Sequence, residues 1–115
     1  MDWKTLNSAE DWENAVATSH HAPIVVFKHS TRCSVSRMAL KMTEQRWDLP
    51  ESTQAYFLDL LANRDISNAI AHEMQVQHQS PQLLCIHNGK CVFHANHGNI
   101  DPVEVKPYLL VWIRL

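Results

Sequence analysis

The sequence predicts an α/β fold with a mixed central sheet and helices on both of its faces. Segments typical of helices and of strands alternate along most of the 115 residues, as in a sheet covered by helices. Later in the chain, two strand-like runs flank an Asn-Gly pair, which predicts a tight antiparallel hairpin and makes the sheet mixed. The expected order of elements is α-β-α-β-α-β-β-α, in a single domain spanning residues 1–115.

The first helix and the first strand are predicted by local signals. Residues 8–11 (Ser-Ala-Glu-Asp) resemble a capping box at the start of a helix. The residues that then share one helical face are Trp12, Ala15 and Val16. Pro23 closes a polar break, and residues 24–27 (Ile-Val-Val-Phe) form the apolar run of a buried strand.

Two further helices and a second strand follow. A helix is predicted after Cys33, and its apolar residues are expected to pack in the core. These residues are Val35, Met38, Ala39 and Met42. Residues 56–61 (Tyr-Phe-Leu-Asp-Leu-Leu) are typical of a strand, and a third helix follows with one apolar stripe. The stripe consists of Ile66, Ala69, Ile70 and Met74.

The hairpin is expected to join residues 81–87 to residues 91–94. Asn88-Gly89 suits a two-residue type I′ turn, in which both positions need positive φ. With that turn, the expected pairs are His87 with Lys90, Ile86 with Cys91, and Cys85 with Val92. Cross-strand partners share a face and successive residues alternate, so Cys85 and Cys91 are expected on opposite faces, unable to bridge.

The last segment predicts a helix near the end of the chain. Asp101 and Pro102 offer an N-cap and a first helical residue, and Pro107 is expected to interrupt the helix after one turn. The apolar residues 108–113 are far fewer than the ~18 of a membrane span. They are expected to form a docked helix.

The composition argues against several classes of function. The formal net charge of −2 provides no broad basic field for binding nucleic acid. No apolar run is long enough for a membrane span, and residues 1–5 lack the features of a signal peptide. A reducing, cytoplasmic location is therefore expected. The three cysteines are then expected to be free, metal-binding or catalytic rather than a disulfide framework.

Cys33 is the strongest candidate for chemistry, because it lies between a predicted strand and a predicted helix. There its sulfur faces unpaired backbone amides and the positive end of the helix dipole, which favour the nucleophilic thiolate. Since the dipole contributes only about 0.3–1 kcal/mol, further positive charge is expected from Arg32 and from Lys28 or His29. The hydroxyl and amide of Ser36 are expected to donate to the sulfur.

Ser36 also defines what this turn lacks. A Cys-x-x-Cys turn resolves a mixed disulfide with its own second thiol, whereas a Cys-x-x-Ser turn needs a thiol from another molecule. If Pro81 lies beside Cys33, Cys85 is about 13 Å further along a strand, too far for a disulfide. The site is therefore expected to be monothiol. A cis peptide at Ser80-Pro81 would leave the preceding backbone free to pair with a bound peptide or thiol.

Other polar residues carry weaker signals. Most of the eight histidines are interpreted as solvated surface residues. His94 and His97 follow the last strand without a third and fourth ligand nearby, so no metal site is predicted. Asp59, in an apolar strand, is open to two interpretations: a buried proton carrier, or an edge charge facing water.

Several ordered segments between Trp3 and Asp101 resemble the monothiol bacilliredoxins, the YtxJ-like proteins of the bacillithiol system. They are residues 27–33 (FKHSTRC), 58–61 (LDLL), 64–68 (RDISN), 80–82 (SPQ) and 94–97 (HANH). The resemblance implies a thioredoxin-like fold, with Cys33 as the nucleophile and Pro81 as a cis-proline. The family's usual turn is Cys-Pro-Ile-Ser; here Ser34 replaces the proline and keeps an amide. Pro107 departs from the family's last helix.

The resemblance also implies an activity, the removal of bacillithiol or another low-molecular-weight thiol from protein mixed disulfides. The small thiol is then a co-substrate, S-thiolated proteins are the partners, and no bound cofactor is expected. The catalytic residues are expected to be Cys33 and Ser36. The thiol-binding residues are expected to be Lys28, His29, Thr31, Arg32, Ser34, Ser80 and Pro81. Two other functions stay open: a redox-inactive thioredoxin-like adaptor, and an iron–sulfur cluster protein of the monothiol glutaredoxin type.

Overall fold

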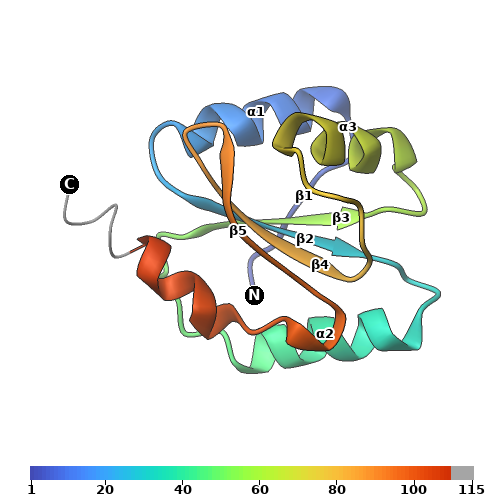
Figure 1. The fold of residues 1–115 in the computed structure, drawn as a ribbon. Helices are drawn as coiled ribbons and strands as arrows, with labels where there is room; N and C mark the ends of the chain where they lie inside the picture. Colours follow the sequence, from blue (N-terminus) through green and yellow to red (C-terminus); the bar gives the residue numbers. More distant parts are fainter. Residues whose placement is uncertain (110–115) are drawn as a thin grey trace.

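The computed structural model describes residues 1–109, which contain a five-stranded sheet in the order β1-β3-β2-β4-β5 (Figure 1). The strands are β1 (Lys4–Thr5), β2 (Ile24–His29), β3 (Gln54–Asp59), β4 (Gln82–His87) and β5 (Lys90–Asn96). β1, β3 and β2 run parallel, whereas β4 is antiparallel to β2 and β5 is antiparallel to β4. The sheet is mixed, as the hairpin signal predicts.

Helices cover both faces of the sheet (Figure 1). The helices α1 (Ala9–Ser19) and α3 (Arg64–Met74) lie on one face. The helix α2 (Ser34–Gln45) and the 3₁₀ helix η2 (Pro102–Val105) lie on the other. A second 3₁₀ helix, η1 (His97–Asn99), follows β5 and contacts α2. Within residues 1–109, no helix combines the length and the apolar character that a membrane span requires.

Each face of the sheet has its own core, because neighbouring side chains of a strand point to opposite faces. All six residues of β2 are buried. Val26 joins the cluster under α1 and α3, which includes Trp12 and Ile70. Phe27 joins the cluster on the α2 side, which includes Val105. β2 is thus held from both faces, and it leads directly to the turn that carries Cys33.

The two ends of the chain differ from the expected element order. The sequence gives no signal for β1, because two exposed residues cannot form a periodic pattern. The last helix begins as η2, where the carboxylate of Asp101 accepts a hydrogen bond from the amide of Val103 at 3.1 Å. Residues 106–109 are α-helical, so the helix changes type beside Pro107. Of the expected docked helix over residues 108–113, residues 110–113 lie outside the described part.

The hairpin has the predicted turn but not the full predicted register. Asn88 and Gly89 have φ angles of 55° and 72°, as a type I′ turn requires. The two pairs next to the turn form as expected. Cys85, however, pairs with Phe93 and not with Val92, because a β-bulge makes Val92 an extra residue on β5. The bulge lets Cys91 and Phe93 pack in the two different cores.

The predicted core face of α2 is wrong for three of its four residues. Val35, Met38 and Met42 are 54%, 66% and 38% exposed, and Ala39 is the one that packs against the core. The helix instead buries Ser36 and Thr43. Both hydroxyls have hydrogen-bond partners, Thr43 by donating to the carbonyl of Ala39 at 2.7 Å. Satisfied hydroxyls can be buried at low cost, so the polar side of this helix can face inward.

A candidate active site around Cys33

Cys33 is the N-cap residue of α2 and is partly exposed. Its backbone is extended, with φ −105° and ψ 122°, and its amide donates to the carbonyl of Ser30 at 3.2 Å. The carbonyl of Cys33 accepts the first helical bond, from Arg37 at 3.0 Å. The sulfur makes no capping hydrogen bond. The thiol therefore lies at a helix N-terminus, where free amides and the dipole stabilise an anion.

The Ser36 hydroxyl is bonded to other groups than the sulfur. Ser36 is fully buried, and its Oγ lies 2.7 Å from Nδ1 of His29. The same oxygen accepts a hydrogen bond from the amide of Ser30 at 3.0 Å. These bonds tie the end of β2 to the first turn of α2. We therefore assign Ser36 as a residue that positions the turn, in place of the expected direct donation to Cys33.

His29 is buried and does not supply the expected positive charge. Its ring lies near the rings of Phe27 and Phe57, with centroid distances of 6.3 and 5.4 Å. Burial lowers the pKa of His29, against a raising effect of Asp59, so the imidazole is neutral at pH 7. Asp59 itself is half-buried, and its carboxylate accepts the amide of Leu61 at 3.1 Å. Asp59 is thus neither a fully buried proton carrier nor an edge charge that faces water freely.

Lys28 also does not lie beside Cys33, where the sequence predicted it. Its side chain is fully buried, and its Nζ donates to the carbonyl of Ser67 in α3 at 3.1 Å. Lys28 therefore points to the α3 face, whereas α2 covers the other face. It cannot touch a thiol bound at Cys33, so its expected role in thiol binding is wrong.

The exposed cations beside Cys33 are two arginines. Arg32 precedes the thiol and is exposed, as are Thr31 and Ser34. Arg37 is exposed too, and its guanidinium donates to the carbonyl of Thr31 at 3.4 Å. Arg37 therefore folds back over the turn. Arg37 was not an expected site residue, although its spacing of four residues from Cys33, one helical turn, is a signal in the sequence that places it near the thiol.

The Ser80–Pro81 step lies at the same end of the sheet as the Cys33 turn, because the end of β2 pairs with the start of β4. The peptide bond is cis, as expected from the resemblance. The carbonyl of Pro81 accepts a hydrogen bond from the amide of His97 at 3.0 Å. The Oγ of Ser80 is buried and has no hydrogen-bond partner among residues 1–109. His97, with a φ of 53°, was not an expected site residue.

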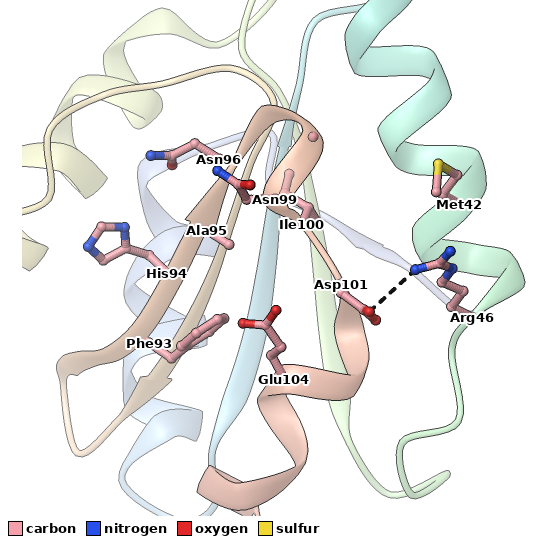
Figure 2. Close-up of a pocket in the computed structure, with 11 residues that line it drawn as sticks. Met42, Arg46, Phe93, His94, Ala95, Asn96, Asn99, Ile100, Asp101 and Glu104 are labelled. Atoms are coloured by element: carbon pink, nitrogen blue, oxygen red, sulfur yellow. Dashed lines mark hydrogen bonds and ion pairs between the residues drawn. The ribbon is translucent and has the colours of Figure 1, made fainter.

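An apolar groove of about 150 Å³ runs beside α2, starting two residues after Cys33. It is lined by Val35, Met38, Ala39, Met42, His97, Gly98 and Ile100. The groove continues into a polar pocket of about 610 Å³, which shares Met42, Gly98 and Ile100 with it. Figure 2 shows this pocket between α2 and the end of β5, with Arg46 and Asp101 paired at 3.3 Å across it. The exposed apolar residues of α2 thus line two adjoining hollows.

The two other cysteines are poor nucleophiles. Burial raises the pKa of Cys85 to about 12 and that of Cys91 to about 11. They pack in different cores, so they lie on opposite faces of the hairpin, as predicted. All three cysteines are free thiols. Within residues 1–109 no group of three or more His, Cys, Asp or Glu side chains could hold a metal ion.

Comparisons with known proteins identify the family and the fold of this chain. The family model described as monothiol bacilliredoxin BrxC matches residues 4–105. A solved structure described as a candidate oxidoreductase with a thioredoxin fold is 27% identical, with a TM-score of 0.77, over 90% of this chain and 89% of that one. Thioredoxin from Trypanosoma brucei brucei is 17% identical, with a TM-score of 0.74, over 99% and 93%. Thioredoxin from Malassezia sympodialis is 15% identical, with a TM-score of 0.72, over 96% and 90%.

Proposed function

Because this chain belongs to the monothiol bacilliredoxin family and is a thiol redox protein with a thioredoxin fold, we propose that it removes bacillithiol, or a similar small thiol, from protein mixed disulfides. We place this activity in the cytoplasm. The observation that carries the proposal is the contrast among the three thiols. Cys33 is partly exposed at a helix N-terminus, whereas burial raises the pKa of Cys85 and Cys91.

The first step is attack by the Cys33 thiolate on the small-thiol sulfur of the mixed disulfide. A bond forms between Cys33 Sγ and that sulfur, the old S–S bond breaks, and the substrate protein leaves as a thiolate that takes up a proton. Ser36 cannot resolve the new disulfide, because it is a hydroxyl already bonded to His29 and Ser30. A thiol of a second molecule must therefore attack the adduct and restore Cys33.

The surroundings of Cys33 suit both halves of such a substrate. The apolar groove offers exposed methionines, which adapt to varied apolar side chains of a protein chain. Arg32 and Arg37 are exposed guanidinium groups flanking the thiol, and they favour an anionic small thiol. The buried, unpartnered Oγ of Ser80 is a further group that a bound thiol can satisfy.

The test is transfer of the small thiol from a modified protein, followed by intact mass. With an S-bacillithiolated protein, we expect the wild-type chain to release the free protein and to gain one bacillithiol on Cys33. Cys33→Ala should do neither, whereas Cys91→Ala should behave as wild type. Parallel reactions with glutathione and cysteine adducts identify the preferred small thiol. Release of bacillithiol by Cys33→Ala at the wild-type rate would show that the proposed function is wrong.

A further inference from the structure

A cluster of polar side chains lies at the active-site end of the sheet, on the α3 face, where the buried Lys28 and Ser67 meet the exposed His78. Lys28 is 0% exposed, and its Nζ lies 3.1 Å from the carbonyl of Ser67 and 3.4 Å from Nδ1 of His78. The hydroxyl of Ser67 lies 3.2 Å from Nδ1 of His78. An ammonium group can only donate, so Nδ1 of His78 is the acceptor and the ring is neutral.

A second buried side chain extends this cluster. Gln82 is 0% exposed and pairs directly with Lys28 across β2 and β4, so the two share a face. Its Nε2 donates to the carbonyl of Gln77 at 3.1 Å and to Oδ1 of Asn96 at 2.9 Å. Its Oε1 has no hydrogen-bond partner among residues 1–109. Two consecutive residues, Gln77 and His78, are therefore each held by a buried side chain of the sheet.

The buried ammonium of Lys28 is costly for the folded protein. Its two hydrogen-bond partners are both neutral. The ion pairs among residues 1–109 join Arg46 to Asp101 and Lys106 to Asp48, so neither neutralises Lys28. A buried charge without an opposite charge destabilises a protein, and an apolar side chain of similar length would avoid that cost. Stability alone therefore does not explain a lysine at position 28.

The cluster holds the segment that leads to the thiol site. Residues 76–80 contain no helix or strand, and they connect α3 to the Ser80–Pro81 step. Val76 is anchored by burial in the core, and Gln77 and His78 by the polar contacts described above. His78 lies two residues before Ser80. Removal of its partners would free this segment just where the chain approaches Cys33.

We propose that Lys28, Ser67 and His78 form a latch that positions Ser80–Pro81 beside Cys33 and so determines how tightly the mixed disulfide binds. Lys28 and His78 are then positioning residues that act on the substrate through the chain at 79–81. This role rests on the proposed thiol exchange. It differs from an electrostatic effect of Lys28 on the thiolate, because the latch needs His78 as much as it needs the lysine.

Three substitutions distinguish the latch from an electrostatic effect of Lys28 on the thiolate. Lys28→Met keeps the length of the side chain and removes the donor. His78→Leu removes the acceptor without changing a charge. His78→Asn restores an acceptor, since Oδ1 of asparagine takes about the place of Nδ1 of histidine. Lys41→Met, on the exposed side of α2, is the matched control for loss of a lysine.

The first measurement is backbone ¹⁵N relaxation of residues 77–80 without substrate. In the wild type and His78→Asn we expect order parameters near those of rigid backbone, roughly 0.85, and in Lys28→Met and His78→Leu values below roughly 0.6. The second is steady-state exchange with a bacillithiolated protein. We expect KM to rise roughly tenfold in Lys28→Met and His78→Leu, the effect of losing a hydrogen bond to a charged group. In both variants kcat should stay within about twofold, with Lys41→Met unchanged.

Unchanged order parameters in both Lys28→Met and His78→Leu would overturn the latch. So would a rise in KM confined to Lys28→Met, which indicates an electrostatic effect. If the wild-type chain reacts with no mixed disulfide, the proposed function fails. The relaxation measurement needs no substrate and still decides whether the latch orders the segment.

Discussion

Ser36 occupies the position that a dithiol turn gives to its resolving cysteine, and its role here is to hold the turn. Its fully buried oxygen joins the ring of His29 to the amide of Ser30. His29 is neutral because burial lowers its pKa, so the ring can take part in this contact without a buried charge. The result is a fixed path from the end of β2 to the N-cap at Cys33.

Loss of this hydroxyl should destabilise the whole protein. Ser36→Ala leaves the amide of Ser30 and the ring of His29 without their buried partner, which costs about 1–3 kcal/mol of the free energy of unfolding. Ser34→Ala, at an exposed position of the same turn, should change that energy by less than about 0.5 kcal/mol. Urea unfolding of the two variants checks this. Equal stabilities would mean that the Ser36 hydroxyl contributes nothing to holding the turn.

At the scale of single residues, the predicted position of Cys33 at the start of a helix is confirmed, but the predicted charges around it are misplaced. Cys33 lies between strand and helix signals that are local, and these signals were sufficient. Lys28 and His29 were grouped as cations because they are close in sequence. The alternation of side chains along β2 puts them on opposite faces, and burial neutralises His29. Arg37 was missed because its return to the turn depends on the helix.

At the scale of elements, α2 shows why an apolar stripe alone does not identify a core face. Val35, Met38 and Met42 have helical spacing, yet they line a groove and stay exposed. The buried side instead uses the satisfied hydroxyls of Ser36 and Thr43. Which side of an amphipathic helix faces inward depends on such tertiary partners, and spacing cannot reveal them. An exposed apolar stripe beside a nucleophile suits a protein substrate.

This gives a prediction about substrate size. Met38→Gln removes apolar surface from the groove and keeps a residue that favours helix. We expect kcat/KM for a mixed disulfide on a protein to fall about fivefold, which corresponds to roughly 1 kcal/mol of lost apolar contact. The rate with a small symmetric disulfide should not change. Lys41→Gln on the same helix is the control. An equal loss with both substrates would argue against protein binding in the groove.

The hairpin shows the limit of local register rules. Asn88 and Gly89 predict the turn and its first two pairs, because a two-residue loop fixes them. The bulge at Val92 cannot be predicted by counting residues from the turn, because it depends on the packing of Phe93 in the α2-side core. The conclusion that Cys85 and Cys91 lie on opposite faces still holds. Cys91 precedes the bulge and pairs with Ile86, and Cys85 is the neighbour of Ile86 on β4, so the faces of the two cysteines alternate.

At the scale of the whole molecule, the sequence was sufficient for the architecture because the sheet is specified by alternating elements and one hairpin. The site gathers at one end of that sheet from three places: the turn after β2, the step before β4, and the loop after β5. The contact between Pro81, just before β4, and His97, at the start of η1, could not be predicted from the turn alone, because the bulge at Val92 shifts the pairing by one residue. The burial of Lys28 follows from the same assembly and affects the stability of the entire fold.

This burial predicts how stability depends on pH. Burial lowers the pKa of Lys28 from 10.5 to about 8 in the folded protein, so between these values the unfolded chain holds more protons. The contribution of Lys28 to the free energy of unfolding should therefore be flat below pH 8 and rise by about 3 kcal/mol up to pH 10.5. Ionisation of the buried thiols acts in the opposite direction, so the wild type must be compared with Lys28→Met, which shares those thiols. In urea unfolding from pH 7 to 10.5, the variant should be the more stable at pH 7 and lose that advantage as the pH rises. Parallel curves for the two proteins would mean that the ammonium of Lys28 is not destabilised by its burial.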